Sequence, residues 1–253
     1  MNIAVIGTGH MGGPIAHALW QAGCTVAVHN RTAARAVALA AGCPGMRVAD
    51  NIPEAVRGTD MVVLAVKPHQ IISVMRQALA VAPKAAMVSL APGITLEQLE
   101  TSGALRALRL MPNVAIACGD GMCFICHGAG SEDAAAELKK ALAPTGEVAI
   151  VEERLFEPAM AVASCGIAFA LRYVRAATEG AVALGLAPDH ATAYVARTLR
   201  GAAAMLEAPD AHPEALIDSV TTPGGATIRG LLAMEQAGFS AAVAAGLSAC
   251  CKR

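Results

Sequence analysis

The fold of the first half is decided by the opening residues, Met1-Asn-Ile-Ala-Val-Ile-Gly7-Thr-Gly9-His-Met-Gly12-Gly-Pro-Ile-Ala16. Residues 2–6 form a short, β-branched run that ends at a glycine, as is typical of a buried parallel strand. Apolar residues then recur with helical spacing, at Met11, Ile15, Ala18 and Leu19. The glycines therefore lie where a strand becomes a helix, and this context predicts a nucleotide-binding turn.

The three glycines of this turn have different tasks. Gly7 permits the tight turn, Gly9 lets a pyrophosphate approach the backbone, and Gly12 lets the helix pack closely on the strand. Free N–H groups at the helix start, together with the helix dipole, bind the phosphates. We expect His10 and Met11, inside the turn, to contact the cofactor too. The alternative is a glycine-rich turn of another α/β protein, which the flanking strand and helix disfavour.

Composition narrows the classes of ligand. The chain has 253 residues, enough for one large or two modest domains. Its 19 basic and 20 acidic residues give a net charge of −1, and 3% aromatic residues offer few stacking platforms, so a small-molecule ligand is favoured over nucleic acid or an anionic membrane. No uninterrupted apolar run approaches the roughly 18 residues of a membrane span, and no signal peptide is recognisable. We therefore expect a cytoplasmic protein without a membrane partner.

One cysteine cluster could indicate a cofactor. Cys123-Phe-Ile-Cys126-His127 has the spacing of a covalent c-type haem attachment site. The surrounding alternation predicts a strand, however, and strand positions three apart face opposite sides. We interpret these thiols as buried small hydrophobic groups and expect no metal site.

The end of the second strand points to the form of the cofactor. Dinucleotide-binding units for NAD usually carry Asp or Glu about 20 residues past the glycines, where it holds the ribose 2′-hydroxyl. This chain has Asn30, Arg31 and Thr32 there instead. A guanidinium beside neutral hydrogen-bonding groups suits a 2′-phosphate, so NADPH is expected, with NADH used less well. The alternative is that Thr32 merely caps the helix that follows.

Three further strands predict the remainder of the binding edge. They cover residues 61–68, 87–93 and 107–113, and their carboxyl ends should meet the cofactor because ligands of open α/β sheets bind there. The cofactor residues expected at these ends are Ala65, Val66, Lys67, Pro68 and Ala91. Lys67 could equally be a solvated strand end. Two more strands are expected at 121–127 and 147–151, on either side of a helix at 131–142. This pattern predicts one domain built on a doubly wound sheet over residues 1–151.

The second half of the chain has helical patterns and no strand patterns. Strand patterns stop after residue 152, and alanine-rich helical patterns cover residues 157–184, 188–206, 225–234 and 240–250. Alanine faces bury little area, so a helical domain over residues 152–253 should gain stability from a second copy of the chain. We therefore expect a homo-oligomer.

A glycine turn inside this half opens a helix. In Asp218-Ser-Val-Thr-Thr222-Pro-Gly224-Gly225-Ala226-Thr227-Ile228, the glycines let N–H groups converge and the helix start favours a carboxylate. Hydroxyls of Thr222 and Thr227 stand on either side. The alternative is a capped helix with nothing bound.

These motifs together resemble the pyrroline-5-carboxylate reductase family over nearly the whole chain. The matching stretches are the glycine turn with its Gly-His-Met, Asn30-Arg-Thr32, Ala65-Val-Lys-Pro-His69, Ala91-Pro-Gly-Ile-Thr95, Met111-Pro-Asn113 and Thr222-Pro-Gly-Gly-Ala-Thr227-Ile. The last is the most specific. The resemblance implies a Rossmann-like doubly wound α/β domain followed by an all-α dimerisation domain, in a homodimer or a ring of dimers. It also implies NADPH-dependent reduction of the cyclic imine 1-pyrroline-5-carboxylate to L-proline.

The resemblance also implies roles for single residues. Gly224, Gly225 and Ala226 would offer backbone donors to the substrate carboxylate with help from Thr222, and Thr227 would hydrogen-bond the imine nitrogen as the catalytic side chain. Asn51 would contact the adenosine half of the cofactor, and the segment 65–67 with Ala91 the nicotinamide side.

One segment departs from the family pattern. Where the family usually has Ser-Gly-Ser-Gly-Pro-Ala-Tyr, this chain has Ala163-Ser-Cys-Gly-Ile-Ala-Phe169, on the substrate side. A related imine reductase therefore stays open as an alternative. A β-hydroxyacid dehydrogenase is disfavoured because no lysine lies within residues 157–184. A non-catalytic NADPH sensor would not require the motif at residues 222–227.

Overall fold

The computed structural model describes residues 1–251. It divides into two compact units, residues 1–164 and the helical unit that begins at Cys165. The domain boundary expected from the sequence lies at 151/152. The division into a cofactor-binding and a substrate-binding domain at 151/152 stays a prediction.

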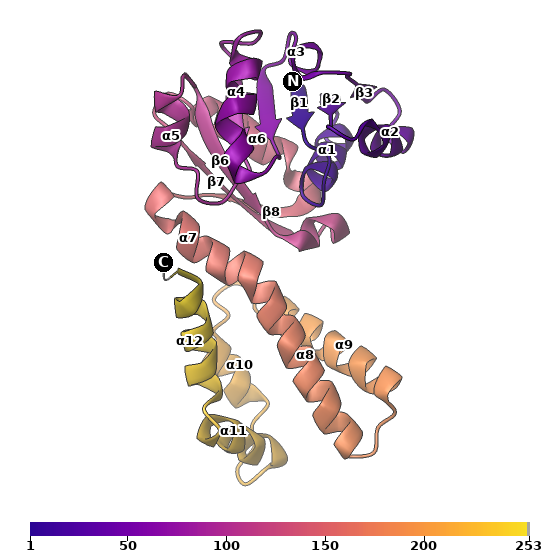
Figure 1. Cartoon of the computed structure of the whole chain (residues 1–253). Coiled ribbons are helices and arrows are strands. Elements are labelled where there is room, and N and C mark those ends of the chain that lie inside the picture. Colours follow the sequence, from indigo (N-terminus) through magenta and orange to yellow (C-terminus); the bar gives the residue numbers. More distant parts are fainter. Residues whose placement is uncertain (252–253) are drawn as a thin grey trace. The chain divides into compact units, whose positions relative to one another are not determined.

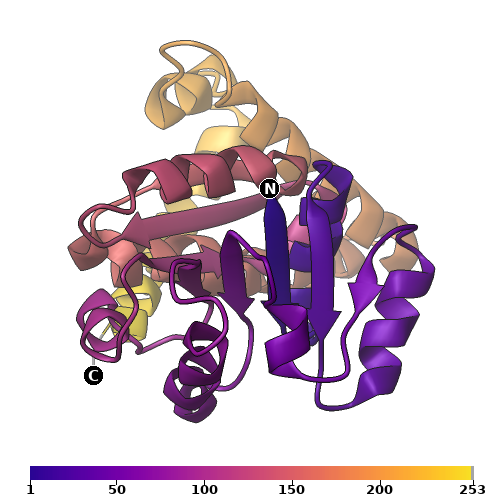
Figure 2. The same cartoon turned by 90° about the horizontal axis from the view of Figure 1, so that it is seen from above.

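The first unit is built on one eight-stranded sheet with the order β3-β2-β1-β4-β5-β6-β7-β8. Its strands lie side by side in the indigo-to-magenta part of the chain (Figures 1 and 2). Their bounds are β1 Asn2–Ile6, β2 Thr25–His29, β3 Arg47–Val48, β4 Met61–Leu64, β5 Ala86–Ser89, β6 Ala107–Pro112, β7 Gly121–His127 and β8 Gly146–Ile150. The reversal of strand order at β1 and β4 is the topological switch point at which open α/β sheets bind ligands.

The sheet is parallel except between β6 and β7. These two strands are joined by a short 3₁₀ segment, η2 (Val114–Cys118), rather than by a crossover helix. A short connection returns the chain in the opposite direction, which forces antiparallel pairing.

Helices cover both faces of the sheet. Their bounds are α1 Gly12–Gln21, α2 Ala33–Ala41, α3 Ile52–Ala55, α4 Ile71–Leu79, α5 Leu96–Thr101, α6 Glu132–Ala141 and α7 Phe156–Met160. Alternate β1 residues divide between two cores: Ile3 and Val5 pack with α1, α2 and α6, whereas Ala4 and Ile6 pack with α3, α4 and α5. This doubly wound arrangement confirms the predicted fold class.

The second unit is helical. It contains α8 Gly166–Ala183, α9 Pro188–Met205, α10 Pro213–Ser219, α11 Ala226–Gln236 and α12 Phe239–Cys251. A π-helical turn, Ala161–Cys165, interrupts the single helix predicted over residues 157–184. Two further elements, α10 and the two-residue strand β3, are too short to be predicted from a periodicity in the sequence.

Large apolar side chains of the helical unit stay exposed. Leu184 is 89% exposed, Leu232 63% and Leu171 62%. By length and composition alone, the continuous helical stretch Glu153–Ala183 could span a membrane, and the bent pair α11–α12 passes the same test together. Contiguous exposed apolar surface marks an interaction face.

The β1–α1 turn is packed tightly against β4. Gly7 has a φ of +103°, and a Cβ there would collide with the carbonyl oxygen of Ala65. A Cβ on Gly12 would collide with the carbonyl oxygen of Gly7 and lie 2.7 Å from the Cβ of Ala65. A Cβ on Gly9 would meet nothing within 4 Å. Gly7 and Gly12 are thus required by packing, whereas Gly9 leaves open space above the turn.

This difference makes a paired prediction. Gly12→Ala should lower the free energy of unfolding by about 3 kcal/mol, because a rigid backbone carbonyl stands where the new methyl group must go. Gly9→Ala should stay within about 1 kcal/mol of the original chain, because it adds a methyl group in open space. Urea denaturation followed by circular dichroism measures both. Equal losses in the two variants would contradict this packing account.

Candidate active site

A cleft opens at the carboxyl ends of β1, β2, β4 and β5, with a volume of about 610 Å³. Its lining combines the glycine turn, the end of β2 and the segments after β4 and β5. The lining residues are Ile6, Gly7, Gly9, His10, Met11, Gly12, His29, Asn30, Arg31, Thr32, Arg35, Ala65, Val66, Lys67, Pro68, Gln70, Val74, Leu90, Ala91 and Pro92. The structure thus brings together all the cofactor residues expected from the sequence except Asn51.

Asn30 holds the glycine turn in place. Its Oδ1 accepts a hydrogen bond from the Thr8 backbone N–H at 3.0 Å, and its Nδ2 donates to the Thr32 carbonyl at 2.9 Å. The backbone N–H of Gly7 also donates to the His29 carbonyl at 2.8 Å. The side chain of Asn30 is therefore committed to joining the two walls of the cleft.

Two arginines lie at the β2 side of the cleft. Arg31 and Arg35 are both exposed, and among the described residues neither pairs with a carboxylate. Thr32 begins α2 without a capping bond from its hydroxyl, so capping does not occupy this group. The sequence analysis missed Arg35, although its position one helical turn after Arg31 is a usable signal. Together these groups form a positive, hydrogen-bonding pocket suited to a phosphate.

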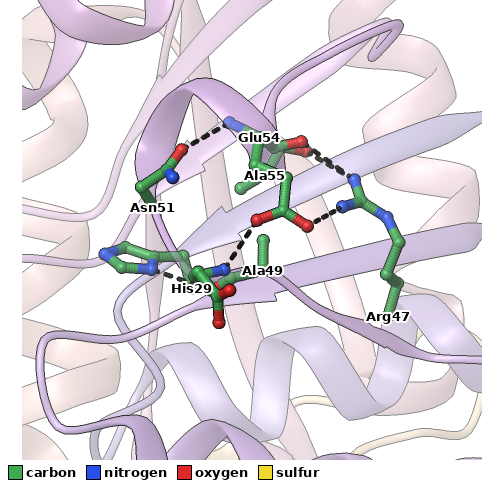
Figure 3. Close-up of polar contacts among 7 residues, drawn as sticks. His29, Arg47, Ala49, Asn51, Glu54 and Ala55 are labelled. Atoms are coloured by element: carbon green, nitrogen blue, oxygen red, sulfur yellow. Dashed lines mark hydrogen bonds and ion pairs between the residues drawn. The ribbon is translucent and has the colours of Figure 1, made fainter.

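Asn51 lies outside the cleft lining, within a polar network at the sheet edge (Figure 3). Its Oδ1 caps α3 by accepting the Glu54 N–H at 2.9 Å. Glu54 in turn pairs with Arg47 at 3.3 Å, and Nδ1 of His29 contacts the Ala49 carbonyl oxygen at 3.1 Å. This network fixes the segment beside the end of β2. A contact of Asn51 with the adenosine half of a cofactor stays a prediction.

The opposite side of the cleft is formed by the chain after β4 and β5. Lys67 is exposed at the start of the 3₁₀ segment η1 (Pro68–Gln70), and its ammonium group has no ion-pair partner among the described residues. Ala91 is buried, and its N–H donates to Oγ of Ser89 at 3.2 Å. Small and apolar groups there would let a flat ring lie against the backbone.

The predicted substrate loop lies between α10 and α11. Gly224 has a φ of +66°, and the N–H of Gly225 donates to the Thr222 carbonyl at 2.9 Å, which closes the turn. Gly225 begins α11, and no side chain caps this helix start. Thr222 and Thr227 are both exposed. An uncapped N-terminus between two hydroxyls is able to accept a carboxylate.

Arg229 adds a cation that the sequence analysis overlooked. Its Nη1 donates to the carbonyl of Gly224 at 2.5 Å, so the guanidinium lies beside the same turn. Its place one helical turn after Gly225 was visible in the sequence, but an exposed helix arginine is common and gave no distinct signal.

The cysteine cluster does not converge. Cys123 packs in the core on the α1 side of the sheet, whereas Cys126 packs in the core on the α4 side. Within residues 1–251, no group of three or more His, Cys, Asp or Glu side chains could hold a metal ion. The spacing of the cysteines therefore reflects two buried faces of β7.

Two family profiles match the chain. Residues 2–95 match the NAD-binding domain of 6-phosphogluconate dehydrogenase, and residues 153–253 match the pyrroline-5-carboxylate reductase dimerisation domain. The first contains the glycine turn and the whole lining of the cleft, and the second contains the turn before α11.

Similar proteins extend the match to both halves at once. A pyrroline-5-carboxylate reductase of Treponema pallidum (strain Nichols) is 32% identical, with 96% of each chain covered. One from Arabidopsis thaliana is 31% identical, covering 100% of this chain and 94% of the relative. The solved structure of a pyrroline-5-carboxylate reductase from Coxiella burnetii superposes with a TM-score of 0.90, at 27% identity and with 98% and 95% coverage. This chain therefore belongs to the pyrroline-5-carboxylate reductase family.

Proposed function

We propose that this protein reduces 1-pyrroline-5-carboxylate to L-proline with NADPH as the hydride donor. The observation that carries the proposal is the uncapped, hydroxyl-flanked start of α11 in a chain that also has a dinucleotide cleft. Family membership over nearly the full length supports it. The imine must receive a hydride at carbon and a proton at nitrogen. In this proposal the cleft binds the hydride donor, and the turn before α11 binds the imine.

The residues of the cleft fit a phosphorylated dinucleotide. The open space above Gly9 admits a pyrophosphate to the N–H groups of α1, and the unpaired guanidiniums of Arg31 and Arg35 suit a 2′-phosphate. Thr32 offers a hydroxyl to the same group. Bound NADPH supplies the hydride from C4 of its dihydronicotinamide. Ala65, Val66 and Ala91 would form the surface that orients this ring.

The loop before α11 would bind and orient the imine. Backbone N–H groups of Gly224 and Ala226 would hold the carboxylate, while the N–H of Gly225 is used to close the turn through the Thr222 carbonyl. Arg229 adds positive charge. Thr222 contributes a hydroxyl to the same group. Thr227 donates to or relays a proton toward the imine nitrogen, which makes the imine carbon a better hydride acceptor. Since a threonine hydroxyl is a weak acid, its task is orientation of the imine.

A second copy of the chain would cover the exposed apolar faces of the helical unit. The dimerisation profile spans residues 153–253, which include Leu171, Leu184 and Leu232. Arg172, Arg175 and Glu179 would be costly within a bilayer, so we assign the apolar stretch Glu153–Ala183 to a protein interface. We therefore propose a cytoplasmic homodimer or ring of dimers, with no membrane or nucleic-acid partner.

A second function is favoured by one specific observation. Residues 163–169 depart from the usual family pattern, and the π-helical turn Ala161–Cys165 lies within this part of the chain. Such turns are frequent at functional sites. A related cyclic imine is therefore the alternative substrate. The lack of lysine within residues 157–184 continues to disfavour a hydroxyacid substrate.

The function is tested by NADPH oxidation with racemic 1-pyrroline-5-carboxylate, run beside 1-pyrroline-2-carboxylate and beside NADH. We expect rapid turnover of the 5-carboxylate with NADPH, slower turnover with NADH, and formation of proline. Turnover of the 2-carboxylate alone would replace the substrate assignment with the alternative. Absence of turnover with both imines would overturn the assignment as a reductase of either.

Cofactor preference should depend on the arginine pair. Arg31→Ser and Arg35→Ser should each raise the KM for NADPH about tenfold, which corresponds to ~1.4 kcal/mol for a lost charged hydrogen bond, and leave the KM for NADH nearly unchanged. Arg76→Ser, which removes an exposed arginine from α4 outside the cleft, is the matched control. Steady-state kinetics with both cofactors measure the change. Equal effects on NADPH and NADH would refute the 2′-phosphate contact.

The hydroxyl of Thr227 should matter for turnover more than for cofactor binding. Thr227→Ala should lower kcat about tenfold or more, because the hydrogen bond between its hydroxyl and the imine nitrogen is lost, while the Kd for NADPH stays within about twofold. Thr227→Ser keeps the hydroxyl and should retain most of the activity. Fluorescence titration with NADPH and initial rates give the two quantities. Equal losses in kcat and in affinity for NADPH would refute a specific role of Thr227 in orienting the imine.

A further inference from the structure

Arg109 on β6 is a charged residue buried inside the first unit. It is 5% exposed, and its Nη1 lies 2.8 Å from Oε1 of Glu153 in the 3₁₀ segment η4 (Glu153–Leu155). Its guanidinium carbon lies 4.3 Å from the ring centroid of Phe156. Cys126 stands opposite Arg109 on β7, and burial raises the pKa of this thiol to about 12, so it carries no charge. Among the described residues, Glu153 is the carboxylate that balances Arg109.

Glu153 also holds the start of α5. The same Oε1 accepts the backbone N–H of Leu96, the first residue of this helix, at 2.8 Å. Thr95 and Gln98 form a capping box at that helix end, so the Glu153 bond adds a tie from outside the helix. One carboxylate oxygen thereby connects β6, α5 and η4.

The hydrogen bond between Glu153 and Leu96 lies next to one wall of the cofactor cleft. The segment between β5 and α5 contains Ala91 and Pro92, both of which line the cleft. At its front end, Oγ of Ser89 accepts the Ala91 N–H, and Ser89 is the register partner of Arg109 on the neighbouring strand. At its far end, Leu96 is held by Glu153. The far end of this wall is therefore fixed by the Arg109–Glu153 pair, and its front end is fixed by Ser89 on the strand beside Arg109.

We propose that Arg109 and Glu153 are positioning residues that hold Ala91 and Pro92 where they set the depth of the dihydronicotinamide ring. The proposal rests on the proposed reductase function. The pair touches no reacting atom. The Arg109–Glu153 pair acts through the segment that contains Ala91 and Pro92. Loss of the pair should therefore impair hydride transfer more than binding of the phosphate and adenosine groups at the other side of the cleft.

The test uses the full chain and the variants Glu153→Gln, Arg109→Met and Arg109→Lys. Glu153→Gln keeps a carbonyl for the Leu96 N–H but removes the charge, and Arg109→Lys keeps the charge. Glu152→Gln is the matched control, because Glu152 pairs with Arg154 on the exposed surface. The measured quantities are kcat, the Kd for NADPH, and the deuterium isotope effect on kcat with NADPH labelled at C4.

We expect Glu153→Gln and Arg109→Met to lower kcat about tenfold or more and to raise the isotope effect, with the Kd for NADPH within threefold of the original. Arg109→Lys should recover part of kcat, and Glu152→Gln should change it less than twofold. A loss of kcat that only follows the folded fraction, with an unchanged isotope effect, would show a merely structural pair and overturn the proposal.

Amide hydrogen exchange separates this inference from the reductase assignment, since it needs no turnover. In Glu153→Ala, which removes the acceptor of the Leu96 N–H, the N–H groups of Ala91 and Leu96 should exchange at least tenfold faster, while those of β1 and α1 keep their rates. Unchanged exchange at Ala91 and Leu96 would overturn the tie even in an active enzyme. If the original chain oxidises no NADPH with either imine, the reductase assignment fails, whereas the exchange rates still decide whether the pair holds the wall.

Discussion

The close approach of the β1–α1 turn to the end of β4 is the constraint on which the cleft depends. No side chain fits between Gly12, the Gly7 carbonyl and Ala65, so α1 begins directly against the sheet. This brings the start of α1 to the switch point between β1 and β4. The bond from Thr8 to Asn30 then fixes the turn to the neighbouring strand. The glycine turn is thus held by close backbone packing and by the Asn30 side chain.

The helical unit obeys a different constraint. Its faces are rich in alanine and several of its larger apolar side chains are exposed, so this unit leaves apolar surface uncovered. The turn before α11 is consequently placed on an element that a second chain would stabilise. Oligomerisation and substrate binding are thereby linked in our account, because the helix that offers its N-terminus to the carboxylate belongs to the unit with uncovered surface.

The sequence predicted features that depend on local patterns. The glycine turn, the buried strands and the Asn30–Thr32 strand end were visible because each has a distinctive spacing, and the family and fold class are confirmed. Asn51, which the resemblance assigns to the cofactor, caps α3 and lies outside the lining of the cleft. Residues without a distinctive pattern, such as Arg35 and Arg229, required the structure.

Long-range pairs were beyond prediction for a physical reason. Arg109 sits in an apolar strand and Glu153 in an acidic turn, 44 residues later, and neither position signals a partner. The antiparallel pairing of β6 and β7 was likewise unpredicted, because the chain reverses through a 3₁₀ segment without a sharp turn signal. The roles proposed for the loop at residues 222–227 depend on the resemblance together with the exposed geometry of the turn.

The central claim is that the cleft presents a dihydronicotinamide to the carbon of a cyclic imine. The most direct measurement is mass spectrometry and NMR of the proline formed from 1-pyrroline-5-carboxylate with NADPH carrying deuterium at one or the other C4 position. Our account predicts one deuterium at C5 of proline from one of the two labelled cofactors and none from the other. Unlabelled proline from both cofactors, or no proline, would contradict it.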